Sequence, residues 1–264
     1  MKIRLSPASP LLIAVCCGLV TAAFPARVLA DTELAGPQEK KIELREAYTL
    51  LQRQRYEVLD ARMNLFQKAY RDGAEDDVAL LRQFNDFAFT EPDMAANFDG
   101  WIKAFPNSYA AHLARGIYYF KSGVQTRGKK YISRTTNAQV QGMTAYLDRA
   151  QQDFQDSLAL DSKPILSYRF LIGIATEYGK KDADRQLLDA ALKLDPKAIT
   201  VRRRYMMSLE TRWGGSLDQM LAFQEESRKA GIADEQMQLL QAMIDKERKW
   251  LARQLSQSDQ VSSD

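Results

Sequence analysis

The sequence is poor in the side chains that most often carry chemistry. Among its 264 residues it has one histidine, His112, and two cysteines, Cys16 and Cys17, close to the amino terminus. We expect the segment that holds both cysteines to be removed, which excludes disulfides, thiolate metal sites and thiol nucleophiles. Ser-His-Asp chemistry would depend on His112 alone, and no nucleophile-elbow motif is present. A zinc site would need several carboxylates, and no spacing suggests one, so we predict no metal and no cofactor.

An excess of charge of one sign is also lacking. The chain has 37 basic and 34 acidic residues, a formal net charge of +3. Three of the basic residues, Lys2, Arg4 and Arg27, lie in the first 30 residues, which contain no acid, so without that segment 34 basic residues face 34 acidic ones. A near-neutral chain has no long-range attraction to nucleic acid or anionic lipid, and we expect neither as a partner.

Residues 1–30 have the features of a secretory signal peptide. A charged start with Lys2 and Arg4 precedes an apolar run over residues 11–23, and residues 28–30 supply a cleavage site after Ala30. The apolar run is too short for a comfortable membrane span. We therefore expect a periplasmic or secreted protein with no membrane span after cleavage; the alternative is a signal that is kept as an anchor.

The rest of the chain has the pattern of an all-α protein. After a polar leader, residues 31–37, apolar residues recur at helical spacing, and no alternating pattern is long enough to predict a strand. We expect about ten or eleven helices in antiparallel pairs over residues 38–255, followed by a disordered polar tail, residues 256–264. The first helical stretch, residues 39–71, is either one long helix or two with a joint near Gln54.

The stretch from Pro164 to Pro196 is the clearest helical hairpin. Two amphipathic segments with one apolar stripe each flank a Gly-Lys-Lys-Asp turn. The order of large and small residues resembles a tetratricopeptide unit, which needs similar neighbours to bury its stripes. Ser108-Tyr109 recurs as Ser167-Tyr168, and a period of about 34 residues carries the apolar stripe of Tyr168 on to Tyr205. We predict antiparallel hairpins stacked as a tetratricopeptide-like α-solenoid with one inner surface.

Two arginines are candidates for binding on that surface. Arg169 and Arg203 are separated by one period, so the repeat places them on the same polar side of neighbouring first helices, where Glu177 also lies. Two stacked guanidinium groups could grip a carboxylate or a phosphate bidentately. The alternative is a pair of solvated arginines beside glutamates, an arrangement that contributes little.

Further candidates lie in two unusual segments. A basic insertion, residues 124–141, contains Arg127 and could contact an anionic group or be a plain solvated loop. The glycines that follow Trp213 permit left-handed backbone geometry, so Trp213 either caps the core at a helix end or stacks on a ligand. His112 falls at an inward position of the repeat, as a core histidine or as a general base beside Arg115.

Several of these segments together resemble an uncharacterised bacterial family, the domain of unknown function numbered four thousand and thirty-four. The matching pieces are Trp101, Pro106, residues 108–116, Arg127-Gly128, Tyr168, Leu171-Ile172, Asp195-Pro196, Arg202-Arg203-Arg204-Tyr205, residues 212–216 and Met220. They cover most of residues 84–231. Val124 and Thr211 depart from the expected tryptophan and proline. The resemblance implies a helical-repeat-like fold and no established activity.

We therefore expect an exported helical-repeat scaffold that binds a protein or peptide partner in the cell envelope and has no catalysis of its own. The candidate binding residues are Arg169, Arg203, Glu177, Arg115, Arg127 and Trp213. The alternative is a periplasmic enzyme acting on a cell-envelope polymer in a groove near His112 and Trp213. A third possibility is a structural component of an assembly. The sequence predicts no oligomeric state.

Overall fold

The structure is a computed structural model that describes residues 44–128 and 134–261. The predicted signal peptide and leader lie outside these residues, as do Lys129 and Lys130 of the basic insertion. The described residues form eleven α-helices joined by short turns, and they contain no strand, which confirms the all-α prediction. None of the helices in these ranges has the length and apolar content needed to cross a membrane.

The first described helices enclose a core rich in aromatic rings. Helices α1 (Leu44–Gln52) and α2 (Tyr56–Arg71) meet at Gln54, whose φ of 55° is left-handed, so the two-helix alternative is correct. Left-handed geometry is uncommon for a residue with a side chain, and here it breaks the helix. Helices α3 (Asp77–Phe84) and α4 (Ala95–Ala104) follow and bury Phe84, Phe98 and Trp101.

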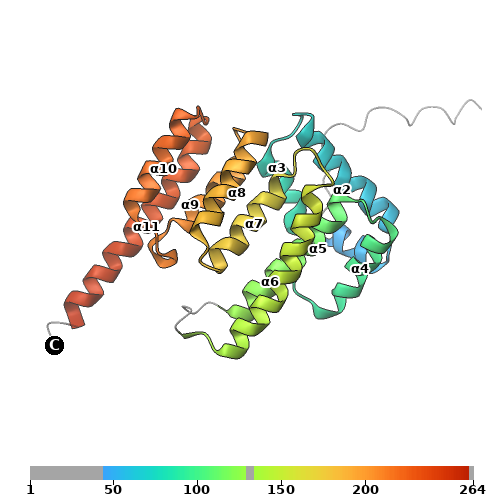
Figure 1. Ribbon diagram of the computed structural model, residues 1–264, viewed down its shortest axis with the longest axis horizontal. Helices are drawn as coiled ribbons and strands as arrows, with labels where there is room; N and C mark the ends of the chain where they lie inside the picture. The colour runs from blue at the N-terminus through green and yellow to red at the C-terminus, as the bar shows by residue number, and fades with distance from the viewer. Residues whose placement is uncertain (1–43, 129–133, 262–264) are drawn as a thin grey trace, which may run out of the picture. The chain divides into compact units, whose positions relative to one another are not determined.

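Helices α5 (Tyr109–Arg127) and α6 (Asn137–Leu158) form a long antiparallel hairpin (Figure 1). Two glycines of α5 allow the close approach, since a Cβ at Gly116 would lie 2.5 Å from Phe154 and one at Gly123 would lie 3.1 Å from Leu147. Side-chain caps from Ser108 and Thr136 begin the two helices. The predicted insertion is shorter than residues 124–141, because helix occupies both of its ends.

The predicted hairpin from Pro164 to Pro196 is confirmed as α7 (Ile165–Glu177) and α8 (Lys181–Leu194), with Gly179 at a φ of 67° in the turn. Helices α9 (Ile199–Ser208), α10 (Leu217–Lys229) and α11 (Asp234–Val261) complete the fold. Tyr168 and Tyr205, the repeat positions, both pack against the core.

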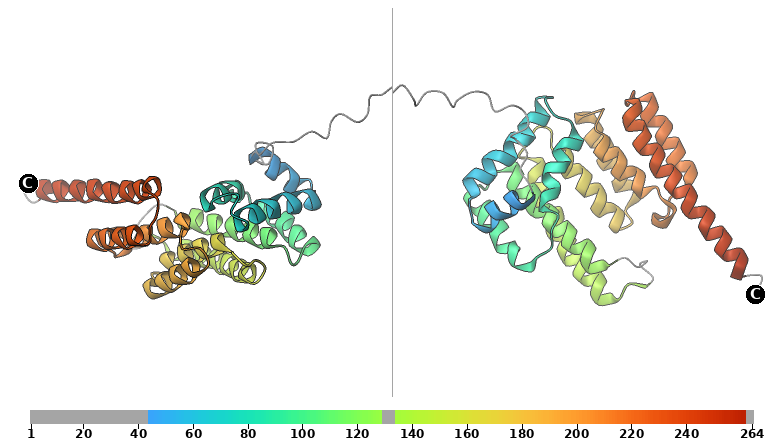
Figure 2. Two further views of the ribbon diagram at one scale, coloured as in Figure 1. Left: turned by 90° about the horizontal axis from the view of Figure 1, so that it is seen from above. Right: turned by 180° about the vertical axis from the view of Figure 1, so that it is seen from behind.

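Helix α11 runs well past the end of its partner α10 (Figure 2). It continues to Val261, so the prediction of a disordered tail from Ser256 was wrong for residues 256–261. The sequence there is polar, but it contains no glycine or proline that would end a helix.

The amino-terminal helices also pack on helices from much later in the chain. Helix α3 contacts both α7 and α9, and α2 contacts α5 (Figure 1). The Asp77 carboxylate at the start of α3 accepts a hydrogen bond of 2.6 Å from the backbone N–H of Thr200, in the first turn of α9. Tyr70 of α2 donates to Asp195 at 2.6 Å. As a result, helices α3, α5, α7 and α9 lie close together although they are far apart in the sequence.

Candidate functional site

The six predicted binding residues fall in three separate places. Arg127, Glu177 and Trp213 come together where α5 and α7 end. Arg115 lies near the start of α5, beside His112. Arg169 of α7 and Arg203 of α9 lie close enough for their charges to interact.

The members of the first group contact one another and Arg212. The Nε atom of Arg127 lies 3.5 Å from Oε2 of Glu177, whose side chain is buried. The guanidinium carbons of Arg127 and Arg212 lie 5.2 and 5.8 Å from the ring centroid of Trp213. Burial raises the pKa of Glu177, and the Arg127 charge opposes that rise. Trp213 therefore stacks on the protein's own cations.

The glycines after Trp213 have the role that the sequence predicted. Gly214 has a φ of 77°, a left-handed conformation. A Cβ at Gly215 would collide with the backbone of Leu209, so a larger residue could not stand there. Trp213 itself is half-buried, which agrees with a residue at the edge of the core.

Arg115 is likewise committed to partners inside the protein. Its Nη2 donates to Oδ1 of Asp153 at 2.7 Å and its Nε to Oδ2 at 3.0 Å, which is a bidentate pair. Its Nη1 donates to Asp99 at 2.8 Å. Asp153 is almost fully buried. Arg115 thus positions a buried carboxylate and has little capacity left for an external ligand.

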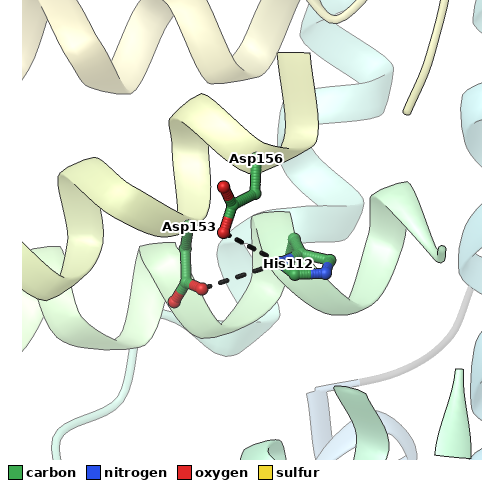
Figure 3. Close-up of side chains that lie close together, drawn as sticks. All are labelled: His112, Asp153 and Asp156. Carbon is green, nitrogen blue, oxygen red and sulfur yellow. Dashed lines mark ion pairs between the residues drawn. The ribbon is translucent and has the colours of Figure 1, made fainter. Parts of the chain in front are cut away.

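His112 is buried, as the repeat alignment predicted, but it faces carboxylates (Figure 3). Its Nδ1 lies 3.7 Å from Oδ1 of Asp153 and 4.0 Å from Oδ2 of Asp156, both on α6. Its Nε2 lies 3.0 Å from the carbonyl oxygen of Pro106. The Asp153 carboxylate raises the pKa of His112, and burial opposes that rise.

Sequence reasoning missed Asp153 and Asp156. Their spacing of three residues puts both on one face of α6, which is a detectable signal. The register of α5 against α6 brings that face to His112, and the sequence does not reveal that register. We call the set of His112, Arg115, Asp99, Asp153 and Asp156 the His112 cluster.

The third place is a pocket of about 170 Å³ with a cationic lining, which we call the arginine pocket. It is lined by Asn85, Ala88, Ile117, Phe120, Lys121, Arg169, Phe170 and Arg204. The cationic side chains come from three helices, because Lys121 belongs to α5, Arg169 to α7 and Arg204 to α9. Arg203 does not line the pocket, but its charge acts on Arg169.

Acids do lie near the arginine pocket, because the charges of Glu177, Asp184 and Glu210 act on Arg204 and that of Asp77 acts on Arg169. Among the described residues, neither Arg169 nor Arg203 forms an ion pair. Burial, together with the charges of Arg204 and Arg203, lowers the pKa of Arg169 to about 9. Because arginine holds its proton so strongly, this lowering indicates that burying the guanidinium group beside other cations is unfavourable. The alternative of solvated arginines paired with glutamates is therefore wrong for Arg169.

Arg204 is held more firmly than its neighbours. Its Nη2 donates to the carbonyl oxygen of Gly173 at 3.0 Å, and its guanidinium carbon lies 5.9 Å from the centroid of the Phe120 ring. The Nε atoms of Arg203 and Arg204 are both buried without a hydrogen-bond partner among the described residues. Buried donors without partners are rare in proteins, and they suit a site that an acceptor group completes.

No curated protein and no solved structure shows a significant match to the chain. The profile of one family, described as a domain of unknown function (DUF4034), matches residues 42–189, more than half of the 264 residues. The match begins before the resemblance seen from Phe84 and ends before the segment Arg202–Ser216. Lys121 and Arg169 thus lie inside the matched range, whereas Arg204 lies outside it. On the strength of this match, the chain belongs to the DUF4034 family.

Proposed function

We propose that the protein is an exported helical-repeat scaffold that binds a protein or peptide partner in the cell envelope and has no catalysis of its own. The observation that carries this proposal is that Lys121, Arg169 and Arg204 line one pocket in which Arg169 has no ion pair among the described residues. An acidic group from a partner would supply the charge and the hydrogen-bond acceptors that the pocket lacks.

The chemistry of the lining favours a carboxylate or a phosphate. Guanidinium groups bind both in a bidentate fashion, and such charge-assisted hydrogen bonds are about twice as strong as neutral ones. Phe120 and Phe170 add an apolar wall that suits the carbon stem of an acidic side chain. A volume of about 170 Å³ holds one such group and not a long polymer segment. The rest of the partner would lie outside the pocket.

The arrangement of the lining supports the tetratricopeptide-like interpretation. In that architecture the first helix of each hairpin lines the inner surface, and here α5, α7 and α9 each supply one cation. Helices α7 and α9 pack against each other, as first helices of neighbouring units would. We propose a stacked solenoid on this basis, with α3 as an additional element at its side. The features of residues 1–30 support export to the periplasm or beyond.

The alternative of an enzyme acting on an envelope polymer finds less support. His112 lies in the first turn of α5, and Trp213 stacks on Arg127, which is the last residue of α5. Residues 112 and 127 are about four turns apart, roughly 22 Å at 1.5 Å per residue. One groove for a reacting bond near both side chains does not fit that separation.

The test is retention of envelope proteins on the immobilised protein. We expect Arg169→Glu combined with Arg203→Glu to abolish retention, because the two substitutions together cancel the combined positive charge of the lining cations and Arg203. A matched control is Arg82→Glu, which changes an exposed arginine of α3. Circular dichroism would confirm that each variant folds. If the double variant retains the same proteins as the unsubstituted chain, the arginine pocket is not the binding site.

A further inference from the structure

The His112 cluster contains a small gap between three potential metal ligands (Figure 3). Nδ1 of His112 and one carboxylate oxygen each from Asp153 and Asp156 lie within 4.8 Å of one another. In a tetrahedral site with bonds of about 2.1 Å, two ligand atoms are about 3.4 Å apart. The observed distances of 3.7 and 4.0 Å from Nδ1 to the carboxylates are close to this value.

The state of the imidazole makes the gap unusual. Nε2 lies 3.0 Å from the Pro106 carbonyl, an acceptor only, so this nitrogen carries a proton and donates. In the neutral ring Nδ1 then presents a lone pair to two carboxylate oxygens. Nδ1 is buried and has no hydrogen-bond partner among the described residues. A lone pair facing two anions is unfavourable unless a cation lies between them.

The surrounding groups hold the ligands as they are held in metal sites. A metal-binding histidine usually donates its other ring N–H to a backbone carbonyl or carboxylate, and its carboxylate co-ligands are themselves hydrogen-bonded. Arg115 fixes Asp153, and Gln152 donates to Oδ1 of Asp156 at 2.8 Å, which leaves Oδ2 directed toward His112. The Asp156 side chain is 43% exposed and gives access from solvent.

The charges of the cluster also lack a cation. The cluster has three carboxylates and one guanidinium group: Asp99 and Asp153 pair with Arg115, and Asp156 lies beside His112. With a neutral imidazole the set has a net charge of −2, which one divalent ion would balance. An imidazole nitrogen with two carboxylates favours Zn²⁺ or a similar transition metal over Mg²⁺ or Ca²⁺, which prefer oxygen ligands.

We infer that His112, Asp153 and Asp156 bind one divalent transition-metal ion of the zinc type, with its remaining coordination positions open to water. This site is independent of the arginine pocket, since it uses other residues and a ligand of opposite charge. It differs from the expectation that no metal site exists, which rested on the absence of a recognisable ligand spacing. The ion would tie the start of α5 to α6.

The test is titration of the untagged, metal-free protein with zinc chloride, followed by calorimetry and native mass spectrometry. His112 is the only histidine, so its ¹⁵N-imidazole NMR signals report on this site alone. We expect one zinc ion per chain, with a shift of the Nδ1 resonance. Asp156→Asn removes a partly exposed ligand with little risk to folding, and it should weaken binding at least tenfold. The control is Asp182→Asn, at an exposed position of α8, which should bind as the unsubstituted chain does.

Two outcomes would overturn the inference. In the first, no stoichiometric zinc binds and NMR shows a doubly protonated ring, so that an imidazolium held by the two aspartates fills the gap. In the second, zinc binds but leaves the His112 signals unchanged, or binds Asp156→Asn with undiminished affinity. Neither outcome affects the arginine pocket, so the proposed function is tested separately.

Discussion

The His112 cluster and the arginine pocket both include residues of helix α5, but the first gathers acidic side chains and the second gathers basic ones. The cluster gathers three carboxylates around one guanidinium group, whereas the pocket gathers several cations with no ion-paired acid at Arg169. A cation would suit the acidic side chains of the cluster, and an anion would suit the basic side chains of the pocket. The chain as a whole is nearly neutral, so overall composition conceals both. Local geometry, and not net charge, shows where binding chemistry lies.

The two places also differ in how their charged groups are held. Asp153 accepts a bidentate pair from Arg115, and this pair is part of the packing between α5 and α6. Arg169 touches the face of the Phe170 ring, with 4.8 Å from its guanidinium carbon to the ring centroid, but it has no acid partner. Removing the buried Asp153 from the cluster should therefore affect folding, and removing Arg169 from the pocket should affect binding.

The largest expected effect is that of Asp153→Asn. The substitution leaves Arg115 without its buried counter-charge, and breaking a buried ion pair costs about 3 kcal/mol of the free energy of unfolding. Urea denaturation in the presence of a chelator measures it without any metal contribution. Asp99→Asn is the control, because the Asp99 side chain is 58% exposed and its loss should cost less than about 1 kcal/mol. Equal costs for the two variants would contradict the distinction drawn here.

The next effect concerns Asp184, the buried acid of α8 whose nearest guanidinium group is that of Arg204. Burial raises its pKa to about 6, although Arg204 opposes the rise. The folded state therefore favours the protonated form, and the stability of the protein should fall as the pH rises from about 4 to about 6. The fall is at most about 3 kcal/mol, since the pKa rises by about two units and one unit corresponds to about 1.4 kcal/mol.

Asp184→Asn should remove this part of the pH dependence and should be more stable than the unsubstituted chain at neutral pH. Thermal unfolding at a series of pH values checks both statements. A variant whose stability keeps the original slope between about pH 4 and pH 6 would show that another group is responsible.

A smaller effect is expected from anions. Inorganic phosphate at about ten times its dissociation constant should stabilise the protein by about 1.4 kcal/mol through the arginine pocket. Differential scanning fluorimetry against sodium chloride of equal ionic strength separates specific binding from screening. Phosphate that acts no differently from chloride would mean that the pocket does not take a free anion.

The smallest effect is that of Arg169→Gln on stability. Because the lost guanidinium group has no acid partner, the free energy of unfolding should change by less than about 1 kcal/mol, while the stabilisation by phosphate disappears. Arg82→Gln, on the exposed face of α3, should leave both quantities unchanged. A large loss of stability for Arg169→Gln alone would assign this arginine to the packing of the core.

Helical periodicity was sufficient to predict the all-α fold and the hairpin from Pro164 to Pro196, but it left the joint at Gln54 as one of two alternatives. It also predicted that Arg169 and Arg203 lie close together, although Arg204 is the residue of α9 that lines the pocket. Neighbouring residues of a helix point about 100° apart, so the rotation of α9 about its axis decides which of the two lines the pocket. The repeat period alone does not fix that rotation.

The His112 cluster could not be predicted for a similar reason. Its acids lie on a different helix from the histidine, and their register depends on how closely Gly116 and Gly123 let α6 approach α5. Arg115, Arg127 and Trp213 were chosen as exposed binding residues, but partners elsewhere in the fold occupy them. A single sequence shows which side chains could bind a ligand, but it does not show which of them are already paired with other side chains of the same protein.

The hydrogen bond between the Asp77 carboxylate and the first turn of α9 limits which fragments of the protein could keep their structure. This hydrogen bond joins positions 123 residues apart, so the first turn of α9 is completed only when α3 is present. Helix α3 is followed directly by Asn85, which lines the arginine pocket. A fragment trimmed to the later hairpins would lose both groups, and during synthesis the arginine pocket can form only after α9, which carries Arg204, has packed against the earlier helices.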